Sequence, residues 1–221
     1  MNNLYNYKKI YIERLFPDVI ENKLFHKLKI DYESIIYITI PQHAEIITNI
    51  VINHLKKNNL KSSDISITDG FAGVGGDTIS FARKFKEVIS IEIDKTRYNY
   101  LSNNVGAYKL NNVILYCDDI MKIVPLIDHH DIIFMDPPWG GKSYKDTELL
   151  RLNIDSENIE TCCSIFFDKM KMICSPKFII LKLPPNYDTL YLKDKLEDIA
   201  DIDIYNLHKM IIVVLTKKNI I

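Results

Sequence analysis

The segment whose residue types are best suited to chemistry reads DPPWGG and spans residues 136–141. Two consecutive prolines remove two backbone N–H donors and stiffen the turn, which leaves the Pro137 carbonyl and the Asp136 side chain to accept from a planar amine. The indole of Trp139 offers a flat face on which a base can stack. Amine methylation mainly requires a nitrogen held in line with the methyl donor. The segment therefore predicts such a site, with Asp136, Pro137 and Trp139 as catalytic residues; a purely structural turn is the alternative.

A glycine-rich segment reads DGFAGVGG and spans residues 69–76. Glycines directly after a strand allow a ligand to approach the backbone closely. The spacing fits the GxGxxG pattern of dinucleotide sites poorly, and the Lys-Ser/Thr pair of a P-loop is missing, so ATP is not the expected ligand. A tight turn without a ligand is the alternative interpretation.

Acidic residues end three successive predicted strands, at Asp69, Glu92 and Asp119. Glu92 lies about 20 residues beyond the glycines, where an acid can bond both ribose hydroxyls of a nucleoside. Asp118 and Asp119 end the next strand, where a carboxylate can accept from an adenine amine. One such acid is often only a helix cap. Three in succession indicate a pocket for S-adenosylmethionine.

The elements that must position these residues alternate between strands and helices. Predicted strands span 64–69, 87–94, 112–119, 131–139 and 177–185, with two closing strands within 201–218. Predicted helices span 41–57, 78–85, 96–110, 159–173 and 189–200. Such alternation requires a mostly parallel sheet with helices on both faces, and ligands bind at the carboxyl ends of its strands. Residues 1–40 are predicted as an N-terminal helical lobe, and residues 41–221 as the main α/β domain.

Composition limits the class of protein. The chain has 221 residues, of which 47% are hydrophobic and 26% charged, and this balance excludes a disordered chain. Its formal net charge is −1. Proteins that coat long nucleic acids usually carry a strong positive excess, so we expect any nucleic acid to be gripped over a small part only.

Localisation and metal binding are predicted from what the sequence lacks. No apolar run reaches the roughly 18 residues of a membrane span, and the N-terminus has no signal core. We therefore expect a monomeric intracellular protein, nuclear or cytoplasmic, that is not secreted and binds no membrane. The four cysteines form no CxxC pair and the six histidines are scattered, so no metal site is expected.

Two of these segments together resemble a known family. FAGVGGDTISFA followed by DPPWGGKSY is similar to the trimethylguanosine synthase family, the RNA cap guanine-N2 methyltransferases. DPPW alone would indicate only an amino-methyltransferase, whereas the combination is more specific, and the similarity runs from about Lys8 to Lys209. The resemblance implies a class I S-adenosylmethionine-dependent methyltransferase with a Rossmann-like, mostly parallel seven-stranded sheet and a small N-terminal helical lobe. It also implies methyl transfer to the exocyclic N2 amine of a 7-methylguanosine RNA cap or cap analogue.

The resemblance assigns roles to particular residues. Trp139 matches the Trp that stacks on 7-methylguanine, and an indole face attracts that cationic base by roughly 0.5–2 kcal/mol. Tyr144 and Lys209 match residues that contact the cap phosphates, and Lys8 or Lys9 matches another phosphate contact. The expected cofactor-binding residues are Asp69, Phe71, Ala72, Gly73, Gly75, Thr78, Glu92, Ile93, Asp118, Asp119 and Asp136. The expected substrate-binding residues are Trp139, Tyr144, Lys209, Lys9 and Lys142.

Five positions depart from the family pattern, and one of them is the family's GGNT stretch, which reads GGDT at 75–78. The family often has Ser where Asp136 stands, and a carboxylate there can accept from the guanine amine and its neighbouring ring N–H. Its GGPxY pattern has Lys142 in place of Pro, which could add a phosphate contact or simply be solvated. Its LPRN stretch reads LPPN at 183–186, so a phosphate-binding Arg is missing and Lys182 or Lys142 is the candidate replacement. Its VTPE motif reads TIPQ at 39–42, so the hydroxyl expected near the cofactor carboxylate is shifted or lost.

Two other functions fit the same residues. An amino-methyltransferase that acts on an internal base of RNA or DNA would share DPPW, but it should carry a larger basic face. An inactive cap-binding protein would keep Trp139 and Tyr144 and fail to bind S-adenosylmethionine. The intact AGVGG segment, Glu92 and Asp119 argue against the inactive protein, whereas Ile40 and Asp77 keep that alternative open.

Overall fold

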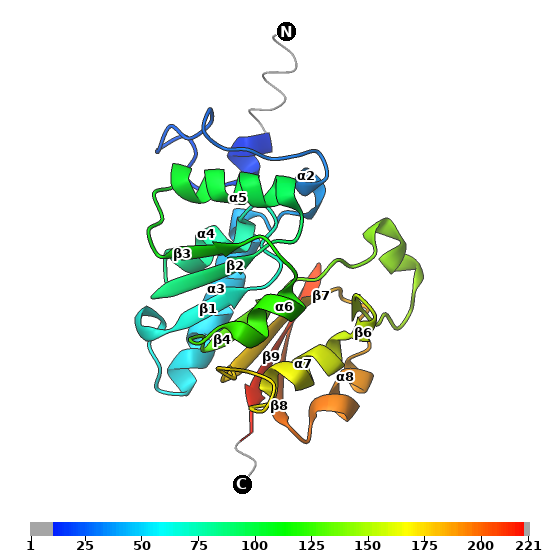
Figure 1. The fold of residues 1–221 in the computed structure, drawn as a ribbon. Helices are drawn as coiled ribbons and strands as arrows, with labels where there is room; N and C mark the ends of the chain where they lie inside the picture. The colour runs from blue at the N-terminus through cyan, green and yellow to red at the C-terminus, as the bar shows by residue number, and fades with distance from the viewer. Residues whose placement is uncertain (1–10, 219–221) are drawn as a thin grey trace. The chain divides into compact units, whose positions relative to one another are not determined.

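The computed structural model describes residues 11–218 of the chain (Figure 1). The predicted phosphate contacts at Lys8 and Lys9 therefore lie outside the described residues. The chain divides into two compact units, residues 1–120 and residues 121–221, and each is described separately below. The predicted division into a lobe of residues 1–40 and a domain of residues 41–221 stays a prediction.

The first unit contains three parallel strands, β1 (Ser66–Asp69), β2 (Glu87–Ile91) and β3 (Val113–Tyr116), in the order β3-β2-β1. The register pairs Asp69 with Ser90, and Ile91 with Tyr116. Because parallel strands run in the same direction, the segments that follow all three strands leave from one edge of the sheet. That edge carries the three acids that the sequence analysis singled out.

Helices connect and precede these strands. They are α2 (Ser34–Tyr37), α3 (Pro41–Lys57), α4 (Gly76–Ala82) and α5 (Lys95–Ala107), with a short 3₁₀ turn η1 (Ser62–Asp64) before β1. Pro41 occupies the first turn of α3, where its missing N–H costs nothing. Asp94 caps α5, because its carboxylate accepts from the backbone N–H groups of Thr96 and Arg97 at 2.9 and 2.8 Å.

Residues 11–40 pack against α5 and the glycine-rich loop, as the blue segment in Figure 1 shows. Residues 11–15 and α2 are helical, and most of the segment between them forms turns. A cluster of buried side chains that includes Phe16 and Leu28 packs on Val74 and Ile79. The first unit therefore has an apolar core that its N-terminal segment shares with the loop after β1.

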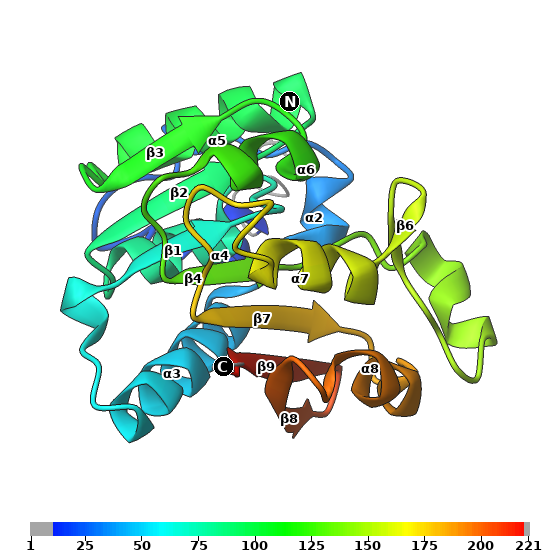
Figure 2. The same ribbon diagram turned by 60° about the horizontal axis from the view of Figure 1, so that its bottom comes forward.

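The second unit contains four strands, in the order β4-β7-β9-β8. They are β4 (Ile132–Met135), β7 (Phe178–Leu183), β8 (Ala200–Leu207) and β9 (Met210–Lys217). β4 and β7 are parallel, and β9 is antiparallel to both β7 and β8 (Figure 2). The register pairs Met135 with Leu181 and Leu183 with Ile211, so the segment after β4 and the hairpin turn before β9 lie at the carboxyl end of β7.

Short elements surround these strands. The helices are α6 (Ile120–Ile123), which starts at the unit boundary, α7 (Ile159–Phe167) and α8 (Thr189–Leu196), and the 3₁₀ turns are η2 (Val124–Leu126) and η3 (Gly141–Asp146). A two-stranded hairpin, β5 (Asn153–Ile154) with β6 (Glu157–Asn158), precedes α7 and was not predicted.

The strand order β3-β2-β1-β4-β7-β9-β8 makes up one seven-stranded sheet, in which β9 is antiparallel to both of its neighbours. The prediction of an α/β fold with a mostly parallel seven-stranded sheet is therefore confirmed. Strands β1, β4 and β7 are buried along their whole length. This agrees with the nearly continuous apolar sequences of β4 and β7, whereas β1 reads SITD and buries mostly polar residues. Within residues 11–218 no helix is both long and apolar enough to cross a membrane.

Asn104 in α5 provides a test of how the N-terminal segment is held. Its fully buried amide accepts from the Lys29 N–H at 2.8 Å and donates to the carbonyls of Lys29 and Val74 at 2.8 and 2.9 Å. Asn104→Ala should lower the free energy of unfolding by about 3 kcal/mol, because several buried backbone groups lose their partner. Asn99→Ala, on the exposed side of the same helix, should change it by less than about 0.5 kcal/mol in the same urea titration.

Candidate active site

The loop between β1 and α4 has a backbone that glycine makes possible. Gly73 and Gly75 have φ angles of 55° and 104°, in the left-handed region that side chains disfavour. At Gly76 the constraint is space, since a Cβ there would lie 2.8 Å from the Thr39 carbonyl oxygen and 2.9 Å from Ile38 Cγ1. The loop is thus shaped by its glycines and held closely against residues 38 and 39.

Asp69, at the end of β1, is held by the helix that follows this loop. The Thr78 hydroxyl donates to Asp69 Oδ2 at 2.6 Å and lies 3.0 Å from the Ser90 hydroxyl of β2. All three side chains are buried, with Asp69 1% exposed. Thr78 was predicted as a cofactor-binding residue, and the structure shows its hydroxyl fixing the orientation of the Asp69 carboxylate.

Glu92 follows β2 and reaches back to the glycine-rich loop. Its Oε2 accepts from the Gly73 N–H at 2.8 Å, and its Oε1 accepts from the Asp94 N–H at 2.8 Å. Burial raises the pKa of Glu92, while these two backbone N–H groups and Arg97 act in the opposite direction. The carboxylate therefore joins the ends of β1 and β2, and each oxygen keeps a lone pair for a further donor.

The other predicted cofactor residues of the first unit differ in exposure. Ile93 is 67% exposed, which is unusual for a large apolar side chain beside a buried acid. Asp118 is exposed, with its Oδ1 accepting from the Asp119 N–H at 2.8 Å, and Asp119 is half-buried. Phe71 is half-buried and Ala72 is buried. Charged and apolar groups thus lie next to one another along this edge of the unit.

A buried pair in the first unit was not predicted from sequence. The Thr39 hydroxyl donates to Asp77 Oδ2 at 2.5 Å, and both residues are buried. Both positions lie in motifs that depart from the family pattern, TIPQ and GGDT, and that shared departure is the signal that could have linked them. The Thr39 hydroxyl expected to be shifted or lost is therefore paired with Asp77.

In the second unit, Asp136 follows β4 and forms an ion pair with Lys182 of β7. Lys182 Nζ lies 2.5 Å from Asp136 Oδ2, and the two side chains are 6% and 18% exposed. Burial raises the pKa of Asp136, and the Lys182 ammonium and the Trp139 indole N–H oppose that rise. The indole Nε1 is itself buried and forms no hydrogen bond of ordinary geometry with the described residues.

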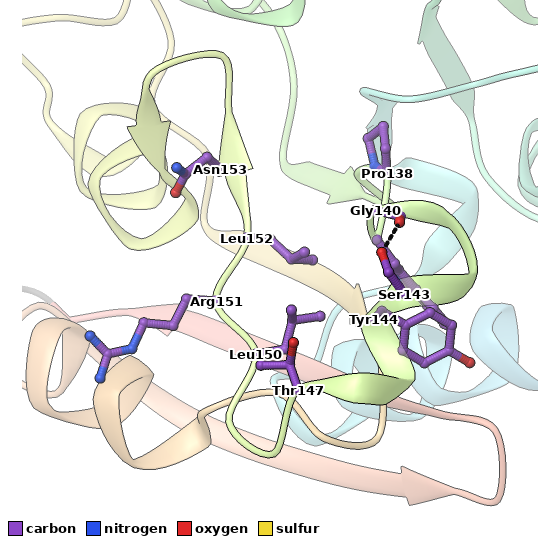
Figure 3. Close-up of a pocket in the computed structure, with 10 residues that line it drawn as sticks. Pro138, Gly140, Ser143, Tyr144, Thr147, Leu150, Arg151, Leu152 and Asn153 are labelled. Carbon is purple, nitrogen blue, oxygen red and sulfur yellow. Dashed lines mark hydrogen bonds between the residues drawn. The ribbon is translucent and has the colours of Figure 1, made fainter.

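Trp139 and Tyr144 stand close together beside this pair. Their ring centres are 5.4 Å apart and the ring planes meet at 82°, so the rings touch edge to face. They line a hollow of about 290 Å³, together with Pro138, Leu150 and Leu152 (Figure 3). The structure thus places an aromatic pair in the wall of a cavity large enough for a base.

Asn186, in the LPPN stretch after β7, fixes the loop that carries Tyr144. Its amide Nδ2 donates to the carbonyl oxygens of Tyr144 and Thr147 at 2.7 and 2.6 Å. This role was not predicted, although LPPN matches the family's LPRN at the Asn position. Tyr144 is therefore held from the carboxyl end of β7.

The cationic residues predicted to meet phosphates have different surroundings. Lys209 is exposed in the two-residue turn between β8 and β9, at the carboxyl end of β7. The side chain of Lys142 lies outside those that the structure describes. Lys182 was one of the two candidates to replace the missing Arg. It is instead buried against Asp136, because the register of β4 and β7 places the two residues side by side. The structure gives that replacement role no support.

Arg151 was also missed from the sequence. Its guanidinium donates to Asp188 Oδ2 from Nε and Nη2, at 3.0 and 2.9 Å, and lies 3.7 Å from the centre of the Tyr191 ring. Figure 3 shows this side chain pointing away from Leu150 and Tyr144. Among residues 11–218, no group of three or more His, Cys, Asp or Glu side chains is placed to hold a metal ion.

Comparison with known sequences decides the family. Residues 65–219 match the family model described as RNA cap guanine-N2 methyltransferase, and this range includes the β1–α4 loop, Glu92 and the DPPWGG segment. The chain belongs to this family. It is therefore a methyltransferase, and the resemblance that the sequence analysis drew from FAGVGGDTISFA and DPPWGGKSY is confirmed.

Two relatives show how far the similarity extends. An uncharacterised protein of Acanthamoeba polyphaga mimivirus is 38% identical over 97% of this chain and 87% of its own length. The trimethylguanosine synthase of Schizosaccharomyces pombe is 32% identical over 56% of this chain, and the match spans 51% of that relative. The chain thus matches about half of the named synthase.

Solved structures support the fold of this methyltransferase. A Geobacter sulfurreducens methyltransferase matches with a TM-score of 0.60 over 98% of both chains, at 15% identity. A 16S rRNA N2 methyltransferase of T. thermophilus, solved with AdoMet and guanosine, matches with a TM-score of 0.59 over 86% of this chain and 44% of its own, at 16% identity. These likenesses confirm a class I methyltransferase fold.

Substitution of Gly76 tests the close approach of residues 38 and 39 to the glycine-rich loop. Gly76→Ala should lower the free energy of unfolding by about 2 kcal/mol, because the new Cβ meets backbone that has little room to move. Gly106→Ala is the matched control, since a Cβ there meets nothing within 4 Å in helix α5. That substitution should stabilise the protein by up to about 1 kcal/mol in the same thermal unfolding measurement.

Proposed function

We propose that this methyltransferase transfers a methyl group from S-adenosylmethionine to the exocyclic N2 amine of a 7-methylguanosine RNA cap. The observation that carries the proposal is the Trp139–Tyr144 pair in the wall of the base-sized hollow, directly after the Asp136-Pro137 turn. Membership of the RNA cap guanine-N2 methyltransferase family and the matched part of the S. pombe synthase support the same conclusion.

The acceptor groups of the first unit suit S-adenosylmethionine, which supplies an electrophilic methyl group when bound. The Asp69 carboxylate is fixed by Thr78 and buried, so it can pair with the ammonium group of the cofactor. Glu92 keeps lone pairs for the ribose hydroxyls, and the exposed Ile93 side chain offers an apolar surface for the adenine ring. Asp118 and Asp119 stand at the next strand end and can accept from the adenine amine. Gly73, Gly75, Phe71 and Ala72 complete the loop in this proposal.

The aromatic pair of the second unit suits a cationic base. A 7-methylguanine carries a positive charge, and an indole face attracts such a ring by about 0.5–2 kcal/mol beyond ordinary stacking. Tyr144 fixes the indole from its edge, and Asn186 in turn fixes Tyr144. Trp139 is therefore the proposed selector of 7-methylated over unmethylated guanine, while Tyr144, Lys209, Lys9 and Lys142 are the proposed phosphate contacts.

Asp136 and Pro137 orient the amine in this proposal. The Asp136 carboxylate and the Pro137 carbonyl are both acceptors, and a guanine edge presents the N2 amine next to the ring N1–H. Accepting from those donors holds the N2 nitrogen in one orientation, which is the main requirement of the reaction. The chain would therefore act through orientation, with little proton chemistry of its own.

Methyl transfer to cap analogues tests the proposal. Purified protein with radiolabelled S-adenosylmethionine should label 7-methyl-GDP and leave GDP unlabelled or labelled about thirtyfold less, because neutral guanine loses a cation–π attraction of about 2 kcal/mol. Mass analysis of the product would count the methyl groups. Labelling of a longer uncapped RNA, with none of 7-methyl-GDP, would contradict the proposal and indicate an internal-base methyltransferase.

Substitutions of Trp139 test the proposed stacking surface in the same assay. Trp139→Ala should lower kcat/KM for 7-methyl-GDP by about 100-fold, because stacking and the cation–π attraction together amount to about 3 kcal/mol. Trp139→Phe keeps an aromatic face and should lose about tenfold or less. If kcat/KM falls equally in the two variants while S-adenosylmethionine binding is unchanged in calorimetry, the base does not stack on the indole face.

A further inference from the structure

Lys182 is a buried cation in a strand that packing alone would fill with apolar residues. It lies between Leu181 and Leu183 in β7, a strand buried at all six positions, and is itself 5% exposed. A lysine in such a place is costly unless its charge is paired. Asp136 supplies that charge at 2.5 Å, so the presence of Lys182 is explained by the residue after β4.

Lys182 also lies close to Trp139, the proposed stacking surface for the base. Its Nζ lies 5.9 Å from the centre of the Trp139 ring, within the range of a cation–π contact. One ammonium group therefore reaches both side chains that would hold the base, the carboxylate and the indole. Packing alone does not explain this contact, because an apolar side chain would fill the same position of β7 without a buried charge.

We propose that Lys182 is a positioning residue for methyl transfer, which holds Asp136 ionised and in one orientation. This inference rests on the proposed function, because it concerns the carboxylate that would accept from the guanine amine. Lys182 donates to Asp136 Oδ2, and an ionised carboxylate has further lone pairs that can accept from the substrate. Lys182 thus has a role other than the phosphate contact that the sequence analysis considered.

The charges around Asp136 explain why a partner is needed. Burial raises the pKa of Asp136, and a protonated carboxyl would offer a donor where the amine needs an acceptor. Lys182 from β7 and the Trp139 indole N–H are the groups that work against this rise. The pair is also neutral overall, so it fixes the base without adding a net charge beside it.

Lys182→Met removes the ammonium and keeps a side chain of similar length. It should lower kcat for 7-methyl-GDP by about 30-fold and change its Kd in calorimetry by about threefold or less, since Trp139 and the hollow remain. The carboxylate form of Asp136 is lost as pH falls, and removal of Lys182 raises its pKa further. The acidic limb of the kcat profile should therefore move to higher pH.

A second substitution separates positioning from simple loss of structure. Asp136→Ser gives the residue common in the family and removes the carboxylate that pairs with the buried Lys182 ammonium, so this variant should be less stable than the double variant Asp136→Ser/Lys182→Met. The double variant should also transfer methyl groups about tenfold faster than Lys182→Met. Such a rescue is expected only if the harm in Lys182→Met comes from the unpaired carboxylate.

Lys177→Met is the matched control. Lys177 precedes β7 and pairs with Asp131, which precedes β4, at 3.0 Å, so it forms an ion pair at the other end of the same two strands. That pair is more exposed, and its loss should leave kcat and the pH profile unchanged.

Two outcomes would overturn the inference. One is a kcat and pH profile of Lys182→Met equal to those of the Lys177→Met control. The other is a double variant no more active and no more stable than the two single variants. Unfolding temperatures need no substrate, so they test the Asp136–Lys182 coupling even if 7-methyl-GDP proves to be the wrong acceptor, a result that would instead refute the proposed function.

Discussion

Parallel pairing of short buried strands is the constraint on which the rest of this structure depends. In the first unit it aligns the ends of β1, β2 and β3, and so gathers Asp69, Glu92 and the segment before Asp119. In the second unit it places Asp136 beside Lys182, because the preceding residues, Met135 and Leu181, are paired across β4 and β7. Residues that are far apart in sequence become neighbours through the register of the paired strands. That register also sets where each loop after a strand begins.

Buried carboxylates in both units are fixed by a specific partner, and the two partners differ in kind. Asp69 accepts from a hydroxyl, that of Thr78. Asp136 is paired with an ammonium, that of Lys182, which neutralises it beside the aromatic pair. The first arrangement suits a site that must attract the ammonium of a cofactor. The second suits a site that orients a positively charged base, because the indole face already provides the attraction for that charge.

Much of the fold and part of the site could be predicted from sequence. The strands, the glycine-rich loop and the DPPWGG turn follow from local patterns, and the strand ends that carry Asp69 and Glu92 follow from the alternation of elements. The Asp136–Lys182 pair could not be predicted, because it depends on the register of strands 46 residues apart, and Lys182 was therefore considered for a phosphate. The hydrogen bonds from Asn186 to the Tyr144 loop also join distant segments, and no local pattern indicates them. For the Thr39–Asp77 bond, the shared departure of TIPQ and GGDT from the family pattern was the one available signal.

The central claim is that Trp139 binds a 7-methylated guanine base. Trp139 is the only tryptophan of the chain, so its intrinsic fluorescence reports on this site alone. The most direct measurement is a fluorescence titration with 7-methyl-GDP and, separately, with GDP. The account predicts saturable quenching by 7-methyl-GDP and binding about thirtyfold weaker for GDP, from the loss of about 2 kcal/mol of cation–π attraction. Equal quenching by both nucleotides, or none by either, would contradict it.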